Sequence, residues 1–341
     1  MGYALLVLLG VVILVNLLFV GLGDPVKMAA GQRTDKATLD NIRKDLRMDS
    51  SKLKSFFIYL NDVSPVGTYD TAEIKRLGIK GVFVGGAQKW GLKVPYLGRS
   101  TQTRKPVADI LMEALPGTLI LTVAAMIIAT LLGIFLGVIA AVKQNTWVDT
   151  SAVMGSIAGI SAPSFFMGII IAYVFGFLLS GFTGLPFAGS WMDIEPYQGR
   201  FWNLQNLILP AITLGIRPLA IITQLTRSSM LDVLDQDYIR TAYAKGLRKR
   251  RVIWRHGLKN ALNPVITAIT GWFAELLAGA FFVEYIFGWK GIGKVTVDAL
   301  EKLDFPVVMG SVLLTAAIFI IVNMLADILY AITDPRIRVQ D

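Results

Sequence analysis

The sequence contains no cysteine and only one histidine, which excludes several kinds of chemistry. Without cysteine the chain can form neither a disulfide nor a thiolate nucleophile, and it offers no cysteine ligand to a metal. A single histidine also argues against a zinc centre built from protein side chains. No pairing of a nucleophile with a base stands out either. We therefore expect no catalytic residue and no metal site.

Charged residues are also scarce: they make up 17% of the 341 residues, whereas hydrophobic residues make up 54%. This composition lies outside the range of soluble globular proteins and predicts that the lipid bilayer is the solvent. The net charge is +9, and much of it comes from one loop between apolar stretches. Phospholipid headgroups and cytoplasmic partners account for a basic loop in that position, so we expect no nucleic acid partner.

Six apolar stretches are long enough to cross the roughly 30 Å hydrocarbon core of a bilayer as helices. We expect these transmembrane helices at residues 3–22, 115–141, 152–180, 206–226, 264–283 and 307–330. The first stretch has no positive charge before it and no clear cleavage site after it, so we interpret it as a retained helix rather than a signal peptide. The predicted fold class is an all-α polytopic membrane protein with six transmembrane helices.

Positive charges in short loops predict the orientation of these helices. The loop at residues 227–259 holds nine Lys/Arg residues against three aspartates, so we expect it in the cytoplasm together with both termini. The long segment at residues 23–109 then lies outside. The expected parts are a first transmembrane helix at residues 1–22, this extracytoplasmic segment, and a core of five helices at residues 110–341.

The segment at residues 23–109 has the pattern of a folded region. Apolar residues recur at helical spacing between Leu39 and Leu46, and residues 72–77 predict a second short helix. Glycines interrupt short apolar runs between residues 79 and 95, which predicts turns or a small hairpin. The segment could cap the helices or help to receive a substrate-carrying protein, and the sequence leaves both roles open.

The basic cytoplasmic loop has the pattern of two short helices separated by a glycine. Leu231, Leu234, Tyr238 and Ala242 recur at helical spacing, which predicts a short helix with one apolar face. Gly246 would end that helix, and a basic segment leads from it to the next transmembrane stretch. Such a helix pair could dock into a groove of a partner protein, or it could lie on anionic lipid through its arginines.

Motifs along nearly the whole chain resemble those of one family of transporters. The loop contains YIRTAYAKGL at residues 238–247 and RHGLKNALNP at residues 255–264. Further matching stretches follow in the expected order at residues 23–26, 97–100, 106–107, 161–165, 283–287, 291–293, 304–306 and 334–338. Together these motifs are similar to the B-type permease subunit of dipeptide and oligopeptide importers, within the binding-protein-dependent ABC permeases.

This resemblance implies a type I importer fold in which residues 227–262 form a coupling loop that fits a cleft on a separate ATPase subunit. The loop residues implied in this contact are Tyr238, Arg240, Thr241, Ala242, Lys245, Gly246, Leu247, Arg255 and His256. As an alternative role, His256 could relay protons. The solute could be a dipeptide, an oligopeptide, nickel, glutathione or an oligosaccharide.

The same resemblance implies the partners and the location. The partners would be a second homologous permease subunit, two ATPase subunits and an extracytoplasmic substrate-binding protein, all at the bacterial inner membrane. ATP and Mg²⁺ would be bound by the ATPase subunits, and this chain would bind no cofactor. Its own glycine-rich stretch at residues 288–294 lacks the Ser/Thr of a phosphate-binding loop, because Val295 stands there.

Two ionisable residues, Arg217 and Glu275, lie well inside expected transmembrane helices. A charge at membrane depth is costly unless it meets a partner or a watery cavity. These two side chains could pair with each other, line the translocation pathway, or reach the lipid interface. Glu275 also leaves open a self-sufficient secondary transporter that uses it as an ion or proton site. ATP-dependent uptake in reconstituted vesicles would separate that alternative from an importer.

Overall fold

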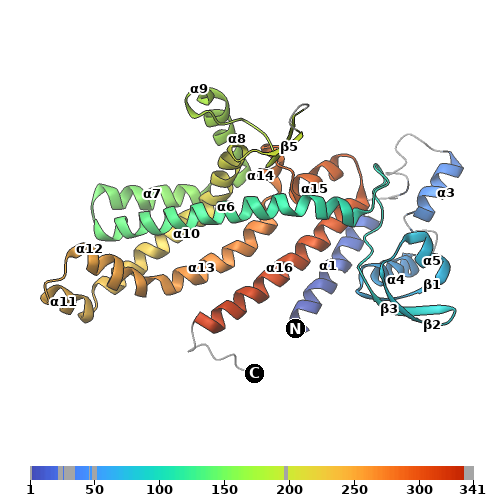
Figure 1. Cartoon of the computed structure of the whole chain (residues 1–341), viewed down its shortest axis with the longest axis horizontal. Coiled ribbons are helices and arrows are strands. Elements are labelled where there is room, and N and C mark those ends of the chain that lie inside the picture. The colour runs from blue at the N-terminus through green and yellow to red at the C-terminus, as the bar shows by residue number, and fades with distance from the viewer. Residues whose placement is uncertain are drawn as a thin grey trace. The chain divides into compact units, whose positions relative to one another are not determined.

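The computed structural model describes residues 2–21, 26, 35–45, 47, 52–195 and 199–333, most of which are helical (Figure 1). The chain divides into two compact units. Unit 1 combines Met1–Leu115 with Val295–Ala317, and unit 2 combines Pro116–Lys294 with Ile318–Asp341.

Three helices are long and apolar enough to cross a membrane: α6 (Val107–Val142), α10 (Gln205–Leu234) and α16 (Phe305–Thr333). The bent pair formed by α7 (Trp147–Ser161) and α8 (Ser164–Tyr173) is a fourth candidate. Two further helices, α1 (Gly2–Gly21) and α13 (Leu258–Gly279), occupy the stretches expected for the first and fifth crossings. The total of six crossings stays a prediction.

The bend between α7 and α8 corrects the expectation of one continuous helix at residues 152–180. The two helix axes are bent by 110°. Between them Ala162 and Pro163 have extended backbone, with ψ angles of 130° and 134°. Proline lacks an N–H and disfavours helical backbone in the residue before it, so the helix is interrupted at this point. After Tyr173 the chain continues into a π-helical turn, η1 (Val174–Leu178).

The described residues between α1 and α6 form a mixed α and β structure, which adds strands to the expected all-α fold. Its helices are α3 (Lys36–Asp45), α4 (Lys52–Val63) and α5 (Thr71–Leu77), and its strands are β1 (Val66–Asp70), β2 (Gly81–Gly85) and β3 (Gln88–Lys93). The strands form an antiparallel sheet in the order β1-β3-β2. The expected hairpin is thus present as β2 and β3, and the expected helix at residues 72–77 is α5. The predicted helical pattern up to Leu46 is seen as α3, with Leu46 itself outside the described residues.

A buried ionic cluster holds α4 against β1 and β3. The Asp62 carboxylate accepts hydrogen bonds from the Arg47 guanidinium at 2.7 and 2.9 Å and from the Tyr69 hydroxyl at 2.8 Å. Arg47 also binds Glu73 at 2.7 Å, and the Lys93 ammonium donates to the Asp62 carbonyl oxygen. Charges taken out of water are tolerated only when paired and hydrogen-bonded, and the Asp62 carboxylate and the Arg47 guanidinium satisfy both conditions.

Unit 2 is built around α10, which packs against α7, α8 and α13. Its core contains fully buried residues from distant parts of the chain, including Leu121, Ile222, Val283 and Trp289. The shorter elements of this unit are η1, α9 (Ser180–Thr183), the hairpin of β4 (Met192–Glu195) and β5 (Gly199–Trp202), α11 (Asp237–Ala244), α12 (Lys249–Arg251), the π-helical turn η2 (Val252–Gly257) and α14 (Phe281–Ile286). The helix α15 (Ile292–Glu301) begins in unit 2 and continues in unit 1.

Candidate functional site

The predicted coupling loop is a separate short helix, α11, beyond the end of α10 (Figure 1). The sequence pattern predicted a single helix that contains Leu231, Leu234 and Tyr238, and this prediction is wrong. Both leucines belong to the last turns of α10, because Gln236 adopts extended backbone with a ψ angle of 149° and separates the two helices. The uninterrupted spacing of apolar residues had concealed this turn.

Gly246 ends α11 as predicted. Its φ angle is +73°, a left-handed conformation that L residues other than Asn and Asp rarely adopt. The Gly246 N–H donates to the Tyr243 carbonyl at 2.9 Å, and the Leu247 N–H donates to the Ala242 carbonyl at 3.3 Å. This pair of bonds is the Schellman arrangement, which satisfies carbonyl groups at the end of a helix. The backbone direction after α11 therefore depends on this glycine.

The helix α11 has one buried and one exposed face. Ile239 and Ala242 are 1% and 7% exposed and pack against the fully buried Val252 of η2, with Leu234 and Leu247 at the edge of the same cluster. The exposed residues of α11 and its C-terminal turn are Asp237, Tyr238, Arg240, Thr241, Tyr243, Ala244, Lys245 and Gly246. The predicted loop residues are thus divided between a structural face and a face that is open to a partner.

The buried face of the loop is continuous with the cores of the long helices. A second cluster joins Val138 of α6, Met230 of α10, Ile253 of η2 and Ala261 of α13, and Leu234 packs against both clusters. Protein interiors are close-packed, so a displacement of α11 must be accommodated by these neighbours. The loop is therefore mechanically linked to three helices of unit 2.

The remaining predicted loop residues lie in η2. Arg255 is exposed, whereas His256 is half-buried and its carbonyl oxygen accepts a hydrogen bond from the Asn260 side chain at 3.2 Å. The same amide donates to the Tyr238 hydroxyl at 2.8 Å. Asn260 thus connects α11 to the start of α13, a role that spacing alone did not indicate.

An ion pair connects α7 to α10 near the loop. The Arg227 guanidinium binds both carboxylate oxygens of Asp149, with the Nη2 contact at 2.7 Å, and the Asn145 N–H also donates to this carboxylate at 3.0 Å. The Asp149 side chain is only 5% exposed. A bidentate, partly buried pair of this kind fixes orientation more strongly than a surface ion pair.

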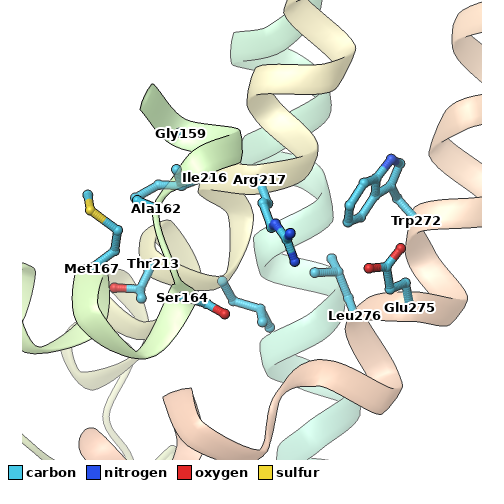
Figure 2. A pocket seen from close by; sticks show the side chains of 11 residues that line it. Gly159, Ala162, Ser164, Met167, Thr213, Ile216, Arg217, Trp272, Glu275 and Leu276 are labelled. Atoms are coloured by element: carbon cyan, nitrogen blue, oxygen red, sulfur yellow. The ribbon is translucent and has the colours of Figure 1, made fainter. Parts of the chain in front are cut away.

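Arg217 and Glu275, the two charges predicted inside the membrane, line one pocket of unit 2 (Figure 2). The pocket lies at the bend between α7 and α8, against α10 and α13. Both side chains are exposed, and no ion pair joins them in the described part of the chain. Half-buried Trp272 and Met167 contribute apolar walls. The structure therefore brings the two predicted residues together around a space.

Sequence reasoning missed the most completely buried carboxylate, that of Glu284 in α14. It is fully buried and accepts hydrogen bonds from the Thr118 hydroxyl at 2.7 Å and from the Gly293 and Lys294 N–H groups at 2.7 and 3.2 Å. A methyl group at Gly291 would collide with this carboxylate. The signal was present in the motif at residues 283–287 and in the glycines that follow it, but their spacing does not reveal that they meet.

No group of three metal-ligating side chains gathers anywhere in the described part of the chain. Two family models match the sequence. The model for binding-protein-dependent transport system inner membrane components matches residues 133–339, and the model for the N-terminal part of such membrane components matches residues 1–122. Together they cover both units.

Curated proteins similar to this chain are permease proteins of transport systems. The dipeptide transport system permease protein DppB of Haemophilus influenzae is 44% identical over 259 residues, which are 71% of this chain and 76% of the relative. The di/tripeptide transport system permease protein DppB of Pseudomonas aeruginosa is 44% identical over 261 residues, with 72% and 77% covered. The glutathione transport system permease protein GsiC of Escherichia coli K12 is 34% identical over 316 residues, with 93% and 89% covered.

These matches agree with the loop motifs and the apolar helices. They identify a transport subunit rather than an enzyme, located in the inner membrane. The chain belongs to the family of binding-protein-dependent transport system inner membrane components and is a permease subunit of an ABC importer.

Proposed function

We propose that this permease forms half of the translocation pathway for short peptides or a similar small solute and is driven by separate ATPase subunits through the loop at residues 227–262. Its partners in this proposal are a second homologous permease subunit, two ATPase subunits that bind ATP and Mg²⁺, and an extracytoplasmic substrate-binding protein. The names of the relatives support the solute class, because glutathione is itself a tripeptide.

The two-faced packing of α11 is the observation that carries the coupling role. Tyr238 and Arg240 are exposed, whereas Ile239 and Ala242 pack into clusters that continue into α6, α10 and α13. An amphipathic helix presented in this way suits a groove on a partner. A push on its exposed face would be passed through close-packed side chains to the membrane helices.

The orientation that we propose places this loop and both termini in the cytoplasm and residues 23–109 outside. The positive charge of the loop supports this choice, since basic residues in short loops favour the cytoplasmic side. The chain has no cysteine, so single cysteines at Lys89 and Lys249 can be labelled without background. Labelling of both positions by an impermeant reagent from the same side would rule out this orientation.

Gly246 provides the test of coupling. Open space surrounds its Cα, so a substitution there meets no side chain and costs only backbone strain. With a φ angle of +73°, Gly246→Val should cost about 1–2 kcal/mol locally and redirect the chain after α11. Gly246→Asn is the matched control, because Asn tolerates left-handed backbone.

We expect Gly246→Val to reach the membrane at normal levels but to lose the ATPase subunits on purification, or to retain ATP hydrolysis without solute uptake. Gly246→Asn should retain most of the uptake. Arg240→Ala should weaken ATPase binding without harming the fold, because the Arg240 side chain is 73% exposed and its 3.7 Å ion pair with Asp237 contributes little. Normal uptake by Gly246→Val with the ATPase bound and stimulated would show that coupling runs through another contact.

A further inference from the structure

The pocket of unit 2 has an unusual combination of small, apolar and charged walls. Gly159, Ala162 and Ser164 line it at the bend between α7 and α8, where their small side chains leave room. Trp272 and Met167 contribute larger apolar surfaces. Ligand sites in proteins are typically concave and mostly apolar, with a few polar groups that fix the orientation of the ligand.

Its two charges come from opposite walls and have opposite signs. Figure 2 shows the Arg217 side chain entering the space from α10 and the Glu275 carboxylate entering it from α13, with the Trp272 ring next to Glu275. Neither side chain forms an ion pair or a hydrogen bond with another residue in the described part of the chain, and the two do not bind each other. Opposite charges held apart on either side of a gap match a ligand that carries both signs.

We propose that this pocket recognises the two free ends of a short peptide in transit, with Arg217 binding the α-carboxylate and Glu275 binding the α-ammonium. This inference rests on the proposed transport of peptides and assigns them a binding site within the permease. Arginine suits the carboxylate because its planar fork can donate two parallel hydrogen bonds. Glu275 offers an acceptor for the ammonium, and the neighbouring Trp272 ring attracts a cation through its face.

The remaining walls explain how the site can accept peptides that differ in sequence. Both ends of every unblocked peptide carry the same two charges, whereas the side chains between them vary. The flexible thioether of Met167 adapts to different shapes, and the small residues at the bend add space. Recognition through the ends therefore selects for peptide length and for free termini rather than for side-chain identity.

The test uses a single cysteine as a reporter in the pocket. Ser164→Cys places the only thiol of the full chain on the pocket wall, and Lys249→Cys, in the exposed loop, serves as the control position. The protein is assembled with its partners in lipid nanodiscs without ATP, and the rate of thiol modification is measured with added peptide. The probes are alanyl-alanine, its N-acetyl derivative and its C-terminal amide.

We expect alanyl-alanine to slow modification at Ser164→Cys but not at Lys249→Cys. Each blocked derivative should protect about tenfold less well, which corresponds to the loss of one charged hydrogen-bonding partner. In the Arg217→Gln background the free and amidated peptides should protect equally. In the Glu275→Gln background the free and acetylated peptides should protect equally. Arg217→Lys and Glu275→Asp keep the charges and should keep part of the preference.

Two outcomes would overturn the proposal: no protection by any of the three probes, or protection that is indifferent to both blocking groups. An unchanged modification rate without peptide shows that each variant keeps the shape of the pocket. The measurement needs no ATP hydrolysis, so it separates this inference from the coupling role. Suppose that Gly246→Val loses uptake, but that protection of Ser164→Cys does not depend on the blocking groups. The proposed function would then stand, and the assignment of the pocket to peptide ends would be refuted.

Discussion

Glu284 and Glu275 are two carboxylates of unit 2 in opposite environments. Glu284 is fully buried, and its oxygens are occupied by the Thr118 hydroxyl and by backbone N–H groups at the start of α15. Glu275 is exposed on a pocket wall, and no described cation binds it. The comparison shows that the position of a carboxylate within an apolar stretch indicates only that its charge is costly. The hydrogen-bond partners of the carboxylate decide whether it stabilises the fold or remains open to a ligand.

The Glu284 cluster also shows how a short loop is fixed to a long helix. The Ile292 N–H donates to the Thr118 hydroxyl at 2.8 Å, and the Trp289 indole N–H donates to the Gly117 carbonyl at 2.8 Å. The carboxylate lies at the N-terminus of α15, where free N–H groups and the helix dipole favour a negative charge. Each of these bonds either joins α6 to residues 284–292 or joins α14 to the start of α15.

The largest effect that we expect follows from removing this carboxylate. In Glu284→Gln an NH₂ group replaces one carboxylate oxygen and cannot accept a hydrogen bond, so the charge is lost and at least one buried donor loses its acceptor. The cost should be about 3 kcal/mol or more, because hydrogen bonds to charged groups are strong and unsatisfied buried donors are penalised. Glu275→Gln, which changes an exposed side chain, should cost less than about 0.5 kcal/mol.

Thermal aggregation of the two purified variants in detergent provides the measurement. Thr118→Val should fall between them, since it removes one donor to Glu284 and the acceptor of the Ile292 N–H. Equal aggregation midpoints for Glu284→Gln and Glu275→Gln would contradict the comparison. The hydrogen bonds that backbone N–H groups donate to Glu284 would then contribute nothing to stability.

The sequence predicted those features that depend on local pattern. Apolar runs located the long helices, Gly246 was recognised as a helix end, and residues 72–77 as a short helix. The break at Pro163 was missed because a continuous apolar run was given more weight than the proline within it. The start of α11 was missed because the apolar spacing continues through the turn at Gln236.

Features that require two distant segments to meet could not be predicted from one sequence. Glu284 and Thr118 are 166 residues apart, and Asp149 and Arg227 are 78 residues apart. Neither separation leaves a local pattern. Arg217 and Glu275 were identified as single residues because a charge inside an apolar stretch is conspicuous, whereas the pocket that they share required the packing of α10 and α13.

The Asp149 and Arg227 pair offers an intermediate case, in which a nearly buried carboxylate is satisfied mainly by an opposite charge. We expect Asp149→Asn and Arg227→Gln each to lower stability by about 1–3 kcal/mol, less than Glu284→Gln, because Arg227 is 25% exposed and water can replace part of the bond. The double variant should cost less than the sum of the two. Additive losses in the same aggregation assay would show that the two side chains do not act as a pair.

A smaller effect than that of the ion pair concerns Lys93, a buried cation of the segment between α1 and α6 whose charge is only partly compensated. Burial lowers the pKa of the Lys93 ammonium to about 8, although the nearby Asp62 carboxylate opposes this change. The unfolded chain therefore binds more protons than the folded chain between pH 8 and the ordinary lysine pKa of 10.5. It follows that the free energy of unfolding of this segment should rise with pH across that interval, on the order of 1 kcal/mol after solvent screening.

Pulse proteolysis of the full protein in detergent can measure this effect with chymotrypsin, which does not cleave at lysine. Between pH 7.5 and 9.5, roughly the range in which the folded-state ammonium loses its proton, the parent protein should become more resistant to cleavage within the segment between α1 and α6. Lys93→Met should show a flatter profile, because it removes the titrating group. Lys80→Met, at an exposed position next to β2, should behave like the parent. A parent profile that falls with pH, or one that Lys93→Met leaves unchanged, would mean that Lys93 is not the group that responds.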